Sequence, residues 1–124
     1  MFDVVALGES LIDFTPNGTN VQGIELFARN PGGAPANVLA MNARLGGKTA
    51  FIGKVGKDGF GDFLRQTLVE SSIDVSGLVI DEKIPTTLAF VQLDSKGDRS
   101  FTFYRNPGCL LYTSDAADDL TRVD

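Results

Sequence analysis

A pair of glycines followed by a short polar segment is the part of the sequence best suited to hold a ligand. Gly32 and Gly33 precede Ala34, Pro35 and Asn37. Glycine lets a ligand approach the backbone closely. Because Pro35 suits the first turn of a helix, free N–H groups and the positive end of that helix would face the ligand, and the Asn37 carboxamide suits hydroxyl groups. The same residues also fit a plain loop-to-helix junction.

Two other segments offer side chains for such a site. Asp13 stands in an apolar stretch and, if it faces a cleft near the end of the first strand, can accept hydrogen bonds from sugar hydroxyls. It equally fits a solvent-facing residue of an alternating strand. Phe101, Phe103 and Arg105 alternate, so they share one face of a strand. They could line a polyol or acid-sugar site, or belong to an ordinary hairpin with one packed face.

Composition excludes several other kinds of chemistry. The 124 residues include 16 acidic and 11 basic side chains, for a net charge of −5, with no histidine and one cysteine. An acidic chain is a poor candidate for binding nucleic acid or an anionic membrane. Without histidine there is no Ser-His-Asp triad and no histidine-ligated metal, and a single cysteine makes no internal disulfide. The chain shows no secretion signal and no apolar run of membrane length, which predicts a cytoplasmic protein.

Two phosphate-binding motifs can be tested and rejected. Residues 47–49, Gly-Lys-Thr, resemble the end of a P-loop, but Asn42 occupies the position where that loop requires glycine. The segment also runs from helix to strand, which is the wrong order. The Gly-x-Gly-x-x-Gly fingerprint of dinucleotide-binding proteins does not follow the first strand.

The elements that would position these residues alternate between strand and helix. They are a strand at 4–7 buried on both faces, a short extended piece at 11–14, a loop at 15–23, a helix at 35–45, a strand at 49–55, a helix from 58 to about 71, a strand at 78–80, and a hairpin of 86–93 and 99–105. This order predicts an α/β fold with a parallel sheet and an attached β element.

Apolar stripes predict which helix faces are buried. Val38, Met41 and Leu45 fall on one stripe of the first helix. In the second helix, which Asp58 can cap, the apolar face consists of Phe60, Phe63, Leu64 and Leu68.

Four segments together resemble the ribokinase/PfkB family of carbohydrate kinases, and within it the fructokinases. They are residues 5–14, 30–37, 51–61 and 99–108. The resemblance covers residues 1–108 without a gap. Leu39 departs from it, since the family usually has a small residue there, but a leucine is tolerable on the buried side of a helix.

The resemblance implies the N-terminal part of a ribokinase-like parallel sheet flanked by helices, with a small β lid from residues of about 12–28 and 86–105. Such lids often pair two subunits, so the full-length protein is expected to be a homodimer. It implies substrate-binding roles for Asp13, Gly32, Gly33, Asn37, Phe103 and Arg105. The implied reaction transfers the γ-phosphoryl group of ATP, held with Mg²⁺, to a hydroxyl of a small-molecule sugar.

The C-terminal part of the sequence lacks the Gly-Ala-Gly-Asp motif that carries the catalytic aspartate in this family. We therefore expect no catalytic residue and no metal ligand in this chain, which alone would be inactive. Residues 1–108 are predicted to be the N-terminal portion of the kinase domain. Residues 109–124 lose both pattern and resemblance, and are predicted to be a non-native tail read from a sequencing adapter.

Two alternatives remain open at this point. One is a fragment of 2-keto-3-deoxygluconate kinase, which shares the aromatic-x-Arg lid motif, although Ala34 and Pro35 favour the fructokinases. The other is a stand-alone binding or interaction domain. Against it, a sheet of about three core strands would leave a hydrophobic edge unpaired.

Overall fold

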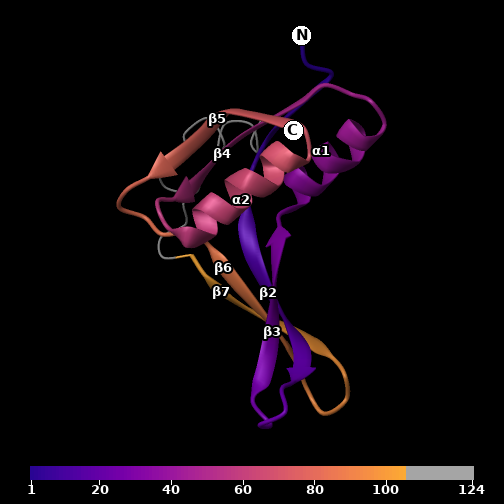
Figure 1. Ribbon diagram of the computed structural model, residues 1–124, viewed down its shortest axis with the longest axis vertical. Coiled ribbons are helices and arrows are strands. Elements are labelled where there is room, and N and C mark those ends of the chain that lie inside the picture. The colour runs from indigo at the N-terminus through magenta and orange to yellow at the C-terminus, as the bar shows by residue number, and fades with distance from the viewer. Residues whose placement is uncertain (106–124) are drawn as a thin grey trace.

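Two β-sheets and two helices make up the fold of this computed structural model, which describes residues 1–105. The first sheet is parallel, in the order β1-β4-β5, with strands Val4–Leu7, Thr49–Gly56 and Ile73–Asp81. Helices α1 (Ala34–Arg44) and α2 (Gly59–Glu70) lie side by side on one face of it (Figure 1). The predicted α/β class with a parallel sheet and helices is confirmed.

The second sheet is the predicted β lid and projects away from the helices (Figure 1). Its order is β3-β2-β6-β7, with strands Glu25–Gly32, Leu11–Thr19, Leu88–Leu93 and Arg99–Tyr104. The loop predicted at 15–23 is confirmed at residues 20–23 and wrong at 15–19, because β2 continues to Thr19 and pairs with β3 through an irregularity between Pro16 and Thr19. Its residues are typical of turns, but pairing with a long partner strand overrides local preference. The predicted non-native tail lies outside the described residues and stays a prediction.

The main core lies between the parallel sheet and the helices. Leu39, Phe51, Leu68 and Ile73 form one buried cluster. Leu39 is fully buried, as expected for its side of α1. The buried face of α2 is also as predicted, since Leu64 and Leu68 are buried and Phe60 and Phe63 are partly buried against the core.

The prediction of which face of α1 is buried is wrong. Val38, Met41 and Leu45 are 61%, 58% and 81% exposed. The helix instead packs through Leu39 with its small neighbours Ala36 and Ala40. Small side chains let a helix lie close to a sheet, so the face with the larger apolar residues is not the buried one.

The other face of the parallel sheet is only partly covered by the described residues. Val5, Ile52 and Val79 are each about half exposed, because α1 and α2 both pack on the opposite face. The expectation that strand 4–7 is buried on both faces is therefore wrong for this part of the chain.

A single carboxylate joins the parallel sheet, α2 and the lid. Asp58 caps α2, as predicted, by accepting a hydrogen bond of 2.7 Å from the Gly61 N–H. It also accepts from the backbone N–H and the hydroxyl of Thr86, at 3.0 and 2.7 Å. The Thr86 hydroxyl in turn accepts from the Gly56 N–H at 2.9 Å. The end of β4, the start of α2 and the segment entering β6 are thus tied to one side chain.

This hydrogen-bond network predicts that the stability of the fold decreases at acidic pH. Desolvation raises the pKa of Asp58, but the hydrogen bonds from Thr86, Gly61 and Phe60 outweigh it and hold that pKa below its usual value. Its contribution to stability is therefore present above the unfolded-state pKa and is lost as the pH falls through the folded-state pKa. We expect Asp58→Asn to destabilise the full-length protein at pH 7 by about 1 kcal/mol and by less near pH 3.

Urea unfolding at both pH values measures this difference. The control is Asp62→Asn, an exposed residue of the same helix. A loss in Asp58→Asn that is equal at the two pH values would contradict the assignment.

Candidate functional site

Asp13 lies against the first glycine of the pair. Strands β2 and β3 are antiparallel, with Leu11 opposite Gly32 and Asp13 opposite Asn30. A Cβ atom on Gly32 would overlap the Asp13 carboxylate, so only glycine leaves room for that side chain. Among the described residues the carboxylate accepts no hydrogen bond, and burial raises the pKa of Asp13. A half-buried carboxylate without a partner is available to accept hydrogen bonds from a ligand.

Glycine is needed at position 33 for a different reason. Gly33 is the N-cap of α1 with φ 110°, a conformation that side chains rarely adopt. A Cβ atom there would overlap the backbone carbonyl of Glu9. Gly33 therefore serves the loop-to-helix junction, while Gly32 accommodates the Asp13 carboxylate.

The lid places two predicted residues on one face. Directly paired residues point to the same side of a sheet, and the register runs from Asn30 to Asp13, Ala89 and Phe103 across all four strands. Because neighbouring strands lie about 4.8 Å apart, the backbones at Asp13 and Phe103 are about 10 Å apart. Ala89 between them is fully buried, and Phe103 stacks on Phe101 at 6.1 Å.

Arg105 connects the lid to the parallel sheet. Its guanidinium lies 2.8 Å from the Glu9 carboxylate and 4.5 Å from the centre of the Phe103 ring. Glu9 lies two residues after the end of β1, and its carbonyl faces Gly33. The ion pair therefore brings Arg105 to the side of the site where the glycine pair lies. Sequence reasoning missed this role of Glu9, because no pattern relates residues 96 positions apart.

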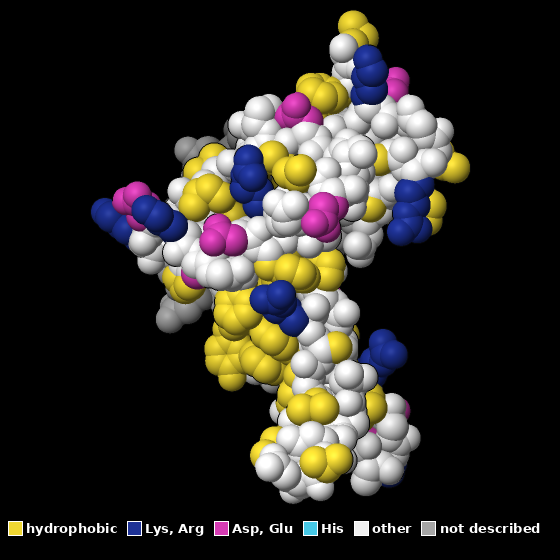
Figure 2. Space-filling view, viewed as in Figure 1, with side chains coloured by type: hydrophobic (Ala, Val, Ile, Leu, Met, Phe, Trp, Pro, Cys, Tyr) yellow, Lys and Arg dark blue, Asp and Glu magenta, His cyan; other side chains and the backbone are white. Residues whose placement is uncertain are grey.

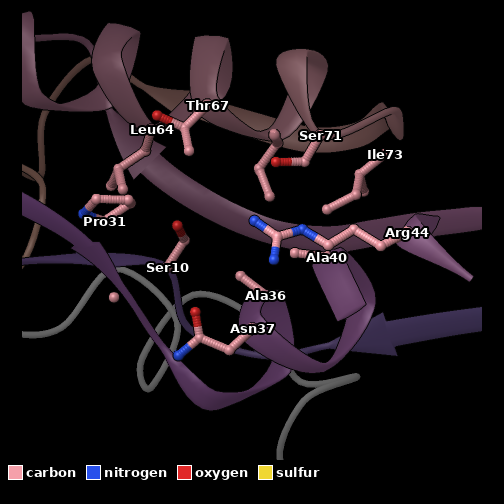
Figure 3. Close-up of a pocket in the computed structure, with 12 residues that line it drawn as sticks. Ser10, Pro31, Ala36, Asn37, Ala40, Arg44, Leu64, Thr67, Ser71 and Ile73 are labelled. Atoms are coloured by element: carbon pink, nitrogen blue, oxygen red, sulfur yellow. The ribbon is translucent and has the colours of Figure 1, made fainter. Parts of the chain in front are cut away.

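Asn37 lies on the helix side of the site, apart from Asp13, Phe103 and Arg105. It lines a pocket of about 230 Å³ between α1 and α2, together with Gly32, Ser10 and Arg44 (Figure 3). Figure 3 shows the Arg44 guanidinium reaching into the middle of this pocket. Asp13, Phe103 and Arg105 do not line it. The structure thus brings Asp13, Gly32 and Phe103 to the lid, with Arg105 and Gly33 beside them, and leaves Asn37 with the helices.

Residues 1–105 show neither a cluster of metal ligands nor a membrane-spanning helix. They contain no group of three or more acidic or cysteine side chains placed to hold a metal ion. None of the helices in this range is long and apolar enough to span a membrane.

The parallel sheet, its two helices and the four-stranded lid match part of the architecture of ribokinase-like sugar kinases. A fructokinase from Xylella fastidiosa superposes with a TM-score of 0.81 at 43% identity, covering 88% of this chain and 34% of that one. One from Vibrio cholerae gives 0.79 at 40% identity, covering 88% and 36%.

The similarity to fructokinases is also found by comparing sequences. "Fructokinase-1" of Zea mays is 47% identical over 115 residues, which are 90% of this chain and 36% of that protein. The protein named "Probable fructokinase-6, chloroplastic" of Arabidopsis thaliana is 46% identical over 123 residues, 96% and 32% of the two chains. The family described as pfkB family carbohydrate kinase matches residues 1–122, and the chain belongs to this family. It spans about a third of the length of these relatives.

Proposed function

We propose that the full-length protein is a fructokinase, which transfers the γ-phosphoryl group of ATP to a hydroxyl of fructose. The observation that carries the proposal is the half-buried, unpartnered Asp13 carboxylate held against Gly32. An ionised carboxylate accepts hydrogen bonds from donors such as the hydroxyl groups of a sugar. The names of the similar proteins supply the reaction, and the solved Xylella fastidiosa fructokinase with bound ATP supports ATP as the donor.

In this proposal the described residues bind and orient the sugar. Asp13 accepts hydrogen bonds from sugar hydroxyls, Gly32 leaves room for that carboxylate, and Gly33 allows the backbone to enter α1 beside it. Phe103 and Arg105 close the site from the lid. Asn37 lines the same pocket as Gly32, so in this proposal it contributes its carboxamide from the helix side of the site, where it has no hydrogen-bond partner among residues 1–105.

The Glu9–Arg105 pair favours a neutral sugar. Its two opposite charges lie 2.8 Å apart, so Arg105 carries little uncompensated charge for the carboxylate of an acid sugar. Fructose is uncharged, whereas 2-keto-3-deoxygluconate is an acid. This supports fructose over the alternative substrate.

A chimera tests the function of this part of the chain. Residues 1–105 replace their counterpart in the Xylella fastidiosa fructokinase, which supplies the remaining two-thirds of the enzyme. We expect ATP-dependent phosphorylation of fructose, with kcat/KM at least tenfold above that for 2-keto-3-deoxygluconate or ribose. A coupled assay for ADP measures it, with the unmodified enzyme as control. A folded chimera that prefers 2-keto-3-deoxygluconate would support the alternative kinase, and one inactive on all three sugars would contradict the proposal.

Homodimerisation through the lid is part of the same proposal. Aromatic side chains gather where the lid meets the helices, and Figure 2 shows this apolar surface below α2. Phe90 stacks on Phe14 at 4.8 Å and meets Phe27 and Tyr104 edge-on, and the last two are partly exposed. Light scattering of the chimera measures its mass, and the mass of two subunits is expected.

A cytoplasmic location is also proposed, and cell fractionation tests it.

A further inference from the structure

Asn30 occupies the position beside Asp13 on the next strand of the lid. The two residues are directly paired across β2 and β3, so both side chains lie on the same face. Asn30 is partly buried.

Contacts within the lid fix the orientation of the Asn30 amide. Its Nδ2 lies 2.9 Å from the Thr15 hydroxyl oxygen, 3.3 Å from the Ala28 carbonyl and 3.4 Å from the Asp13 carbonyl. Because three acceptors surround this atom, the donating NH₂ group of the amide must lie on that side. The Oδ1 atom therefore points away from them, accepts no hydrogen bond among the described residues, and is not sealed from solvent.

We propose that Asn30 is a specificity-determining residue of the sugar site: Oδ1 accepts a hydrogen bond from one sugar hydroxyl while the Asp13 carboxylate accepts from its neighbour. Side chains paired across an antiparallel ladder have Cβ atoms about 5 Å apart, a spacing that suits two adjacent hydroxyls. This inference rests on the proposed sugar kinase function.

The choice of asparagine has a physical reason. A second carboxylate beside Asp13 would raise the pKa of one of the two groups and weaken both as acceptors at neutral pH. An amide oxygen adds an acceptor without adding charge. The Nδ2 contacts hold that oxygen in place before the sugar arrives, which lowers the entropy lost on binding.

The test uses Asn30→Ala in the chimera, with fructose and a series of monodeoxyfructoses as substrates. Loss of one neutral hydrogen bond predicts a KM for fructose about three- to tenfold higher, with an unchanged KM for ATP. We also expect one monodeoxyfructose that the parent chimera discriminates against to be used by the variant as well as fructose. A variant that discriminates against every deoxy sugar as the parent does would overturn the inference.

Thr15→Val is the matched structural control. It removes the 2.9 Å contact to Nδ2 and leaves Oδ1 present, so it is expected to keep most of the discrimination. If Asn30→Ala folds poorly, Asn30→Ser gives the same test, because its hydroxyl is too short to replace Oδ1. A parent chimera inactive on fructose would refute the proposed function. An active parent with an unchanged Asn30→Ala variant would refute this inference alone.

Discussion

Asp13→Asn is expected to lower kcat/KM for fructose in the chimera by about 100-fold. Hydrogen bonds to a charged acceptor contribute roughly 1.5–3 kcal/mol each, and an amide oxygen replaces only part of that. Steady-state kinetics with fructose and with ATP measure the effect, and the KM for ATP should stay within twofold. The exposed Asp62→Asn on α2 is the control.

The same substitution should leave the protein folded. Because burial raises the pKa of Asp13, its contribution to stability is present below the unfolded-state pKa and is lost as the pH rises through the folded-state pKa. At pH 7 the charged carboxylate therefore disfavours folding, and Asp13→Asn should keep or raise the free energy of unfolding. Loss of activity with full stability identifies a binding residue, whereas parallel loss of both would contradict the role.

Gly33→Ala is expected to reduce the free energy of unfolding of the chimera by about 3 kcal/mol. The residue has φ 110°, which costs a non-glycine residue roughly 1–3 kcal/mol. Its Cβ would also press on the Glu9 carbonyl, and overpacking adds roughly 1–3 kcal/mol. Urea unfolding followed by circular dichroism measures the change.

Gly46→Ala separates these two causes. Gly46 also has a positive φ, of 92°, but a Cβ there meets no atom within 4 Å. We expect a loss of about 1 kcal/mol from backbone strain alone. Equal losses in the two variants would show that the contact with Glu9 contributes nothing.

Local patterns predicted most elements. The helix expected at 35–45 is observed at Ala34–Arg44, and the strand expected at 49–55 is observed at Thr49–Gly56. The Asp58 cap was also predicted and is confirmed. Each depends on neighbours in the sequence: a proline in the first turn, glycines after the last, or a carboxylate three residues before the N–H that it accepts from.

Predictions that depended on distant partners were the ones that were wrong. The apolar stripe of Val38, Met41 and Leu45 has helical spacing, yet it is exposed, because the sheet receives Leu39 and two alanines instead. The turn-like residues at 15–19 form a strand because β3 is present to pair with them. Periodicity gives the faces of a helix but not the face that a sheet covers.

For the candidate site, the sequence by itself determined which side chains have the right chemistry: the glycine pair, the Asp13 carboxylate and the aromatic-x-Arg segment. Only the tertiary structure decided their grouping. It placed Asp13 against Gly32, paired Arg105 with Glu9, left Asn37 between the helices, and set Asn30 beside Asp13. The reason is physical: chemical type belongs to each residue alone, whereas proximity depends on strand register and on side chains that only the folded chain brings together.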